Sequence, residues 1–351
     1  MRGLIGRLLV LIFLLSPSLG LAAIASYAGT YTGTYTGPAG GTWAITISQT
    51  GAITGTIDDT NQASGLASAD GSLAFASTGL DVSFVGTITL STGAVAGTWV
   101  LNRLGVSGTF SGKAPYMGLW NNPNEAGWGI SITQHSSSII FAAAYTYDTN
   151  GRPIWYVMPN CPVVASGSCT SPMYRVSGAT PPTVPWNGAG KVVGTAGSGT
   201  LNFTDVDHGT FTFTIDGVGG VKTIQKQLFS NGTHQARTDY TDLWWNANES
   251  GWGVAVNQDH GIIFATWFTY DGAGNPLWYV ASNCTLVGSG CTGDLYQVTG
   301  DTPLTSAWNS TNQVVTTVGT ITFAFAGANA GTMNYSINGV SASRDITRQP
   351  F

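Results

Sequence analysis

The second half of the chain contains one sequence written twice, and this repeat limits the possible folds more than any other feature. The phrase LWNNPNEAGWG at residues 119–129 returns as LWWNANESGWG at residues 243–253. A repeat with a period of roughly 120 residues is a duplicated domain, because the units of solenoid proteins span about 20–50 residues. We therefore predict two copies of one module, at residues 116–229 and 240–351, with the polar run at 230–239 as the linker between them.

The composition indicates that both copies are built from β-strands. Charged residues make up 8% of the chain, against about a quarter of a typical globular domain. With two glutamates and four lysines, the chain can form few of the i,i+4 ion pairs that support helices. Glycine, threonine, aliphatic and aromatic residues favour strands and tight turns instead. No basic stripe is present, so we expect no nucleic-acid partner.

Each copy has the pattern of about seven or eight short antiparallel strands. Apolar runs at 139–147 and 153–157 flank the turn DTNG in the first copy, and the second copy has DGAGN at the same place. We expect a loop with two cysteines next, and then further strands at 173–176, 192–204, 209–215 and 221–228. Such a set forms either a small sandwich or a closed barrel, and the sequence does not choose between them.

Residues 26–113 form a third β unit with a different sequence. Threonine alternates with apolar residues in stretches such as GTWAITISQTGAITGTI, and glycine-containing turns separate these stretches. This pattern predicts an up-and-down meander of about six to eight strands, and over a short stretch it is similar to avidin and lipocalin barrels. The predicted fold class is all-β, with three antiparallel units of which the last two are a tandem duplication.

The first 25 residues have the pattern of a secretory signal peptide. Arg2 and Arg7 precede an apolar run at 8–15, and the small-residue site Ala-Ile-Ala follows at 23–25. The apolar run is too short to anchor the chain, and no later stretch is suited to a transmembrane helix. We therefore expect a secreted or periplasmic protein that can associate with the cell surface.

Each copy contains one pair of cysteines, Cys161 with Cys169 and Cys284 with Cys291. In an exported protein, two such pairs predict two local disulfides that staple a loop. A metal-binding or redox pair is the alternative, but the spacing matches neither C-x-x-C nor a zinc pattern.

The repeated phrase supplies the candidate site residues. The chain's only two glutamates, Glu125 and Glu249, stand at the same place in the two copies. In one interpretation the phrase is a binding surface, because tryptophan faces stack on sugar rings while Asn and Glu bond to hydroxyl groups. The candidate ligand-binding residues are Trp120, Asn124, Glu125, Trp128 and Trp155 in the first copy, and Trp244, Asn248, Glu249, Trp252 and Trp278 in the second.

In the other interpretation each glutamate is structural. Glu125 would pair with Lys222 or Lys226 across the first and last strands of its module and clasp a barrel shut, or it would cap its turn. Arg344 and Arg348 are the matching cations of the second copy. The two interpretations are compatible, because a glutamate held by a cation can still line the mouth of a pocket.

The two copies resemble a module of secreted proteobacterial proteins marked by W-N-x-x-E-S-G-W-G, F-A-T-W-F-T-Y-D, G-x-P-x-W and I-T-R-Q. In this chain these elements are residues 244–253, 264–271, 274–278 and 346–349. The first copy departs from the pattern, for example with Ala126 in place of Ser250. Such modules accompany exported hydrolases or stand alone, so the resemblance implies accessory binding or surface attachment and brings no settled activity with it.

Motifs for catalysis and cofactor binding are missing from the sequence. It contains no G-x-S-x-G, no H-E-x-x-H and no phosphate-binding loop, and we predict neither a cofactor nor a metal. A metal site or triad shared by the copies is excluded because the histidines occupy no matching positions: His135, His208, His234 and His260. The acidic pairs Asp58–Asp59 and Asp205–Asp207 fit turns better than calcium ligation.

The predicted function is non-enzymatic binding or surface attachment outside the cytoplasm, with a polysaccharide or surface polymer as the partner. Self-assembly into an extracellular layer or fibre is one alternative, because the predicted strands have few charges at their edges. A hydrolase is another: it would use Glu125 or Glu249 with Asp148 or Asp271. Those two aspartates fit better as the first residues of the hairpin turns.

Overall fold

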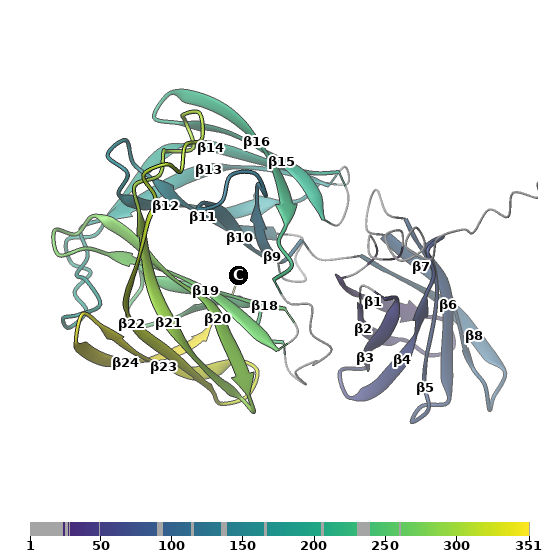
Figure 1. Ribbon diagram of the computed structural model, residues 1–351. Helices are drawn as coiled ribbons and strands as arrows, with labels where there is room; N and C mark the ends of the chain where they lie inside the picture. Colours follow the sequence, from purple (N-terminus) through teal and green to yellow (C-terminus); the bar gives the residue numbers. More distant parts are fainter. Residues whose placement is uncertain are drawn as a thin grey trace, which may run out of the picture. The chain divides into compact units, whose positions relative to one another are not determined.

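The computed structural model describes residues 24, 27, 29–48, 50–89, 94–113, 116–134, 139–164, 167–204, 207–229, 239–259 and 261–350. Most of the predicted signal peptide and most of the predicted linker lie outside these residues. The described part of the chain is organised as 24 β-strands in three closed antiparallel barrels of eight strands each (Figure 1). Within it, no helix has the length and apolar character needed to cross a bilayer.

Barrel 1 is an up-and-down barrel in which β1 pairs with β2 on one side and with β8 on the other. Its interior is aromatic: Phe75 and Phe84 stack with ring centroids 4.7 Å apart. Gly112 lies so close to Trp43 that a Cβ atom there would be 2.4 Å from the indole ring. Glycine therefore makes room for a large ring in a narrow barrel. The strands are β1 (Gly29–Thr36), β2 (Gly41–Ile47), β3 (Ala52–Ile57), β4 (Asn61–Ala67), β5 (Ser72–Ser77), β6 (Val82–Thr89), β7 (Ala94–Leu101) and β8 (Val106–Lys113).

Barrel 2 is formed by the first copy of the repeat. Its closing strand, β9, lies between β10 and β16. The strands are β9 (Gly118–Asn121), β10 (Gly129–Gln134), β11 (Ile139–Tyr147), β12 (Pro153–Pro162), β13 (Ser168–Ser177), β14 (Val192–Phe203), β15 (His208–Ile215) and β16 (Val218–Lys226).

Barrel 3 is formed by the second copy and has the same topology, with β17 paired to β18 and β24. The strands are β17 (Asp242–Trp245), β18 (Gly253–Asp259), β19 (Ile262–Tyr270), β20 (Pro276–Val287), β21 (Gly290–Thr299), β22 (Val314–Phe325), β23 (Ala330–Ile337) and β24 (Val340–Arg348). The all-β prediction with three antiparallel units is therefore confirmed. Of the two architectures that the sequence left open, the structure has the closed barrel.

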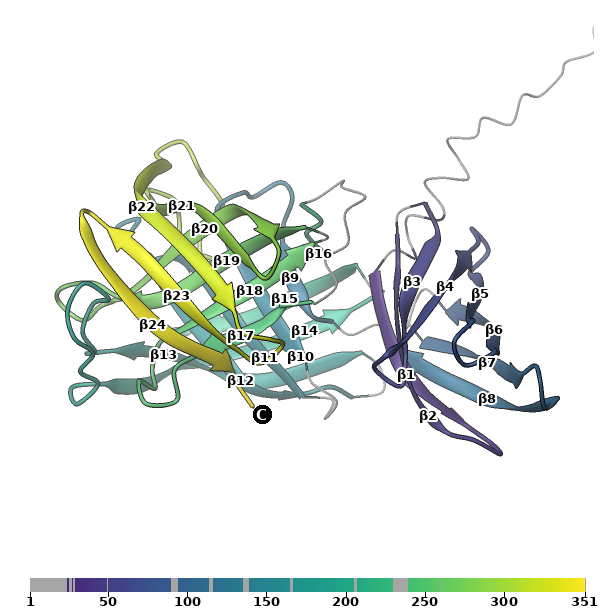
Figure 2. The same ribbon diagram turned by 90° about the horizontal axis from the view of Figure 1, so that it is seen from below.

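The chain divides into two compact units, Met1–Pro115 and Tyr116–Phe351. The second unit contains both copies of the repeat, and Figures 1 and 2 show barrels 2 and 3 side by side. Strand β12 of barrel 2 lies against β20 of barrel 3. One apolar core cluster includes residues of both barrels, such as Tyr145 and Trp155 of barrel 2 with Phe268 and Trp278 of barrel 3.

This packing buries both faces of β11. Ala142 and Ala144 belong to the interior cluster of barrel 2, whereas the alternate residues Ala143 and Tyr145 belong to the cluster between the barrels. A strand buried on both faces is continuously apolar instead of alternating. The contact between the copies therefore accounts for the continuous apolar run at 139–147.

The cysteines lie in strands, which corrects the expectation of a separate cysteine loop. β12 extends to Pro162 and β13 begins at Ser168, so Cys161 and Cys169 stand on the two arms of a hairpin. The reason is that the strands of the repeat are longer than their apolar segments suggest. Beyond its apolar segment, each of β12 and β13 continues with residues that are less apolar and in part exposed.

Candidate functional site

The repeated phrase forms a three-residue contact around Glu125, which we call the clasp. Asn122 and Asn124 build the turn after β9: the Asn122 side chain accepts the backbone N–H of Asn124 at 3.0 Å. This turn directs Glu125 toward Lys222 on β16, whose Nζ lies 2.8 Å from Oε2 and 3.0 Å from Oε1. The indole N–H of Trp128 donates to Oε2 at 3.0 Å.

The second copy builds the same clasp with a different cation. Arg344 on β24 places its Nε 3.3 Å from Oε2 of Glu249. The indole N–H of Trp252 donates to the same oxygen at 3.0 Å. Asn246 accepts the backbone N–H of Asn248 at 2.9 Å, so the turn is conserved in geometry between the two copies.

Each clasp spans the seam at which its barrel closes. β9 and β16 are paired through only two residue pairs, Asn121 with Gln225 and Trp120 with Lys226. Short ladders stabilise a closed sheet weakly, because few hydrogen bonds join the strands. An ion pair that is four-fifths or more buried adds a second connection across the same two ends of the sheet: the side chains of Lys222 and Glu125 are 11% and 18% exposed.

Barrel 3 has an additional ion pair at its seam. Arg348 on β24 places Nη1 2.9 Å from Asp242 Oδ2 on β17, and Asp242 is buried. The guanidinium also lies over the ring of Trp244, 5.4 Å from its centroid. In barrel 2 these positions are Lys226 and Gly118, so the seam of the first copy lacks this carboxylate.

The structure places the predicted tryptophans in the interior of the molecule. All six of the candidate tryptophans are at most 7% exposed: Trp120, Trp128, Trp155, Trp244, Trp252 and Trp278. The clasp glutamates are partly buried, and Asn124 and Asn248 are exposed on their turns. Buried rings offer no free face to a sugar arriving from solvent, so this geometry favours the clasp interpretation; ligand binding at these residues stays a prediction.

Two of these tryptophans join the two copies. The indole N–H of Trp155 donates to the carbonyl oxygen of Thr269 at 3.0 Å, and that of Trp278 donates to the carbonyl oxygen of Thr146 at 2.9 Å. Trp155 and Trp278 are equivalent in the repeat, as are Thr146 and Thr269. The contact between the barrels is therefore reciprocal, like the interface of a symmetric dimer.

The long loops after β13 and β21 extend this reciprocity. Gly178 donates its backbone N–H to Gly274 at 2.7 Å, and the equivalent Gly300 donates to Gly151 at 2.8 Å. Leu304, from the second copy, packs into the interior cluster of barrel 2. In the other direction, Tyr335 inside barrel 3 donates to the carbonyl oxygen of Pro182 at 2.8 Å. Each copy thus contributes a loop to the core of its partner.

Asp301 is a buried acid that the sequence analysis did not single out. It is 2% exposed, its Oδ2 accepts from Gln313 at 2.6 Å, and its Oδ1 has no hydrogen-bond partner. Burial raises the pKa of this carboxyl above its ordinary value, although the hydrogen bond from Gln313 opposes the effect. The first copy has Ala179 at this position, and that exchange of alanine for an acid is the signal that could have identified it.

The aspartates of the hydrolase alternative begin hairpin turns. The Oδ1 atom of Asp148 accepts the backbone N–H groups of Asn150 at 2.8 Å and of Arg152 at 3.0 Å. Asp271 accepts those of Ala273 and Asn275 in the same way. Both aspartate side chains therefore stabilise hairpin turns, which is the role predicted for them from the sequence.

The other titratable candidates that the structure describes form no metal-binding group. Asp58 accepts the hydroxyl of Tyr35 at 2.8 Å, and burial together with this carboxylate raises the pKa of Tyr35 to about 12. His208 is exposed on β15. His135, His234, His260 and Asp205 lie outside the described residues. Within the described part of the chain, no three His, Cys, Asp or Glu residues are grouped so that they could hold a metal ion.

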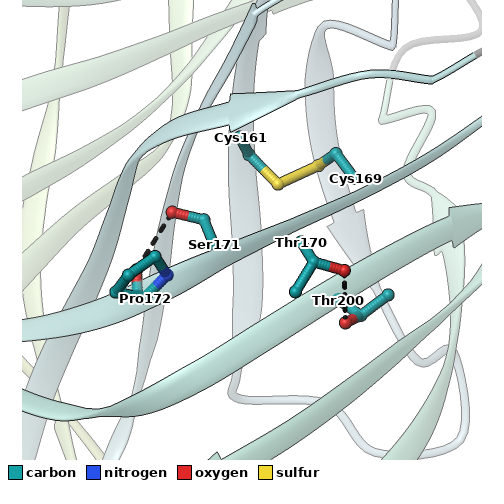
Figure 3. The surroundings of a disulfide bond; sticks show 6 residues. All are labelled: Cys161, Cys169, Thr170, Ser171, Pro172 and Thr200. Atoms are coloured by element: carbon teal, nitrogen blue, oxygen red, sulfur yellow. Dashed lines mark hydrogen bonds between the residues drawn. A yellow bond between two sulfur atoms is a disulfide. The ribbon is translucent and has the colours of Figure 1, made fainter.

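Both predicted disulfides are present, Cys161–Cys169 and Cys284–Cys291. All four cysteines are buried. Figure 3 shows the first bond beside Thr170, whose hydroxyl is hydrogen-bonded to that of Thr200 on β14 at 2.9 Å. In the second copy the bond lies where the pairing of β20 with β21 is interrupted between Val280 and Thr285. The disulfides therefore hold together hairpin arms that backbone hydrogen bonds join only in part.

Comparison with known proteins adds two distant structural similarities. No protein-family model matches the chain, and neither does any curated protein. The intact N and C lobes of the transferrin-binding protein Ap-TbpB are similar at 10% identity over 91% of this chain and 76% of that chain, with a TM-score of 0.22. A tryptophan-to-alanine mutant of transferrin-binding protein B from Haemophilus parasuis Hp5 is similar at 12% identity over 92% and 76%, with a TM-score of 0.21. Similarities of this size carry no argument about function.

Proposed function

We propose that this chain is an exported binding protein without enzymatic activity. The observation that carries the proposal is that both glutamates of the chain are held in the same way, by a cation and by an indole N–H. A catalytic carboxylate needs an oxygen that faces the substrate. Both oxygens of Glu125 contact Lys222 already, and Oε2 of Glu249 contacts both Arg344 and Trp252. These contacts support barrel closure as the role of the glutamate in each copy.

Two observations support a location outside the cytoplasm. The leader-like pattern at residues 1–25 is that of an exported chain. All four cysteines are paired in disulfides, which persist in oxidising compartments and are rare in the cytosol. The proposed location is therefore the periplasm or the cell exterior, where surface attachment is the role implied by the W-N-x-x-E-S-G-W-G resemblance.

The proposed ligand is a polysaccharide or a similar surface polymer. The part of each repeated phrase that is open to such a ligand is the turn with Asn124 or Asn248. Side-chain amides donate and accept hydrogen bonds at once, which suits hydroxyl-rich polymers. Two equivalent turns in one compact unit would give a repetitive polymer two points of attachment, and linked sites bind more tightly than either alone. The buried tryptophans would hold these turns from inside.

Self-association is a second candidate, supported by one observation. Val192 and Val193 on β14 are 61% and 58% exposed, and the equivalent Val314 and Val315 on β22 are 54% and 57% exposed. Matched apolar pairs on a surface with few charges favour association. Association through unpaired strand edges is not favoured, because the described strands close into barrels.

An array of polysaccharides tests the proposal with the chain from residue 26 onward. We expect retention of at least one polysaccharide without release of new reducing ends. The variant N124A/N248A should lose retention and keep its unfolding midpoint, whereas the control Asn202→Ala, an exposed asparagine on β14, should keep both. Retention of no polysaccharide would contradict the ligand class, and hydrolysis that is lost in a folded Glu125→Gln variant would overturn the proposal. Light scattering tests self-association: a concentration-independent monomer rejects it.

A further inference from the structure

A cavity of about 150 Å³ lies between barrels 2 and 3. Its walls come from both copies: Phe141, Trp155 and Val176 from barrel 2, and Trp245, Trp252 and Phe268 from barrel 3. The remaining lining residues are small, aliphatic or uncharged polar, so no ionisable side chain lines it. A space of this volume accommodates a single benzene-sized ring.

The cavity coincides with positions at which the two copies differ. Ala143 on β11 occupies the place that Thr266 has in the second copy, and the smaller side chain leaves volume between the barrels. Trp245 on β17 occupies the place of Asn121, so an indole forms a wall here where the other copy has a short amide. The contact between the barrels is otherwise reciprocal, but the wall formed by Trp245 has no equivalent in the first copy.

Trp245 also provides an unused hydrogen-bond donor. Its Nε1 atom is buried and has no hydrogen-bond partner. A buried N–H without an acceptor is costly, and tryptophan N–H groups usually find one. Trp267 has an unpartnered N–H as well, but Trp267 does not line the cavity. At Trp245, an open apolar space and an unused donor occur together.

We infer that this cavity is a binding site for a small neutral aromatic molecule that bears one hydrogen-bond acceptor. The ring would fill the space among Phe141, Trp155 and Phe268, and the acceptor would take the indole N–H of Trp245. A charged ligand does not fit, because nothing in the lining would compensate its charge. This site goes beyond the proposed polymer binding: it lies between the barrels, its lining includes neither Asn124 nor Asn248, and it takes a ligand of different chemistry.

The test uses the full chain labelled with 15N and two probes of similar size, benzonitrile, which has an acceptor, and toluene, which has none. Titration is followed by the indole N–H resonances, assigned by single substitution. We expect saturable shifts of the Trp245 resonance with benzonitrile, and tighter binding of benzonitrile than of toluene by about fivefold, the contribution of one hydrogen bond. The variant Trp245→Phe should bind both probes equally, at the toluene level.

Ala143→Leu fills the space and should abolish binding of both probes. The unfolding midpoint of Ala143→Leu shows whether this variant has folded. If it has not, the inference is tested by comparing the binding of the two probes to Trp245→Phe. The inference is overturned if neither probe gives saturable shifts in the wild-type chain, or if Trp245→Phe keeps the preference for benzonitrile. Polymer retention on the array is measured independently, so failure of either proposal leaves the other intact.

Discussion

The indole N–H of Trp155 in the first copy donates a hydrogen bond of 3.0 Å to the carbonyl oxygen of Thr269 in the second copy. The equivalent bond from Trp278 to Thr146 runs in the opposite direction across the same interface. The two copies are thus joined as the subunits of a symmetric dimer would be, although one chain contains both.

Replacing either of these tryptophans by phenylalanine should weaken the joint between the barrels. Trp155→Phe and Trp278→Phe each remove one buried hydrogen bond and leave a carbonyl oxygen without that donor, so each should lower the free energy of unfolding by about 1–2 kcal/mol. Denaturant unfolding measures the loss. Because the contacts are reciprocal, the two values should be similar; a loss for one variant and none for the other would contradict the symmetric interface.

The disulfides should stabilise the two copies to nearly equal extents. They close loops with sequence separations of 8 and 7 residues, and loop-closure entropy assigns about 2.5 kcal/mol to each. The double variants C161S/C169S and C284S/C291S should therefore lose about that free energy of unfolding. The denatured, unreduced wild-type chain should titrate no thiols; four reactive thiols there would show that the bonds do not form.

Asp301 should make stability depend on pH. Its pKa is raised in the folded protein by burial, so the folded state binds a proton more readily than the unfolded state. Above the folded pKa the buried charge lowers stability, and this cost disappears as the pH falls through that value. Asp301→Asn can still accept from Gln313, and it should be more stable than wild type at pH 7.

The difference between Asp301→Asn and wild type should shrink as the pH is lowered toward the ordinary range of aspartate. Thermal unfolding of both proteins between about pH 4 and pH 8 measures this. A constant difference, or one that grows on acidification, would contradict a raised pKa for Asp301. Ala179→Asn in the first copy serves as the matched control, because no acid is replaced at that equivalent position.

Most of the fold could be predicted because it depends on local patterns. Alternation, turn residues and the repeat identified the β class, the hairpins at Asp148 and Asp271 and the cysteine pairs. The pairing of Glu125 with a cation on the last strand was predictable because both copies have a glutamate in the repeated phrase and a cation, Lys222 or Arg344, near the end of the module. The sequence could not choose barrel over sandwich, because closure depends on whether the first strand meets the last, as β9 and β16 do.

The contact between the copies was missed for a physical reason. A strand buried on both faces and a strand in a large core have the same apolar sequence, so the run at 139–147 did not reveal that one face of β11 meets another barrel. The sequence predicts Trp155 and Trp278 as ligand candidates, because an indole suits a binding surface as well as a buried contact. The buried Asp301 has no sequence motif and depends on loops that meet only in the folded unit.

The central claim is that one glutamate per copy closes a barrel. A double-mutant cycle on Glu125→Gln and Lys222→Met, with the free energy of unfolding as the readout, tests it most directly. Each single variant should lose about 2–4 kcal/mol, the cost of breaking a mostly buried ion pair, and the double variant should lose much less than the sum because no unpaired charge remains. Additive losses, or single variants as stable as wild type, would contradict the clasp.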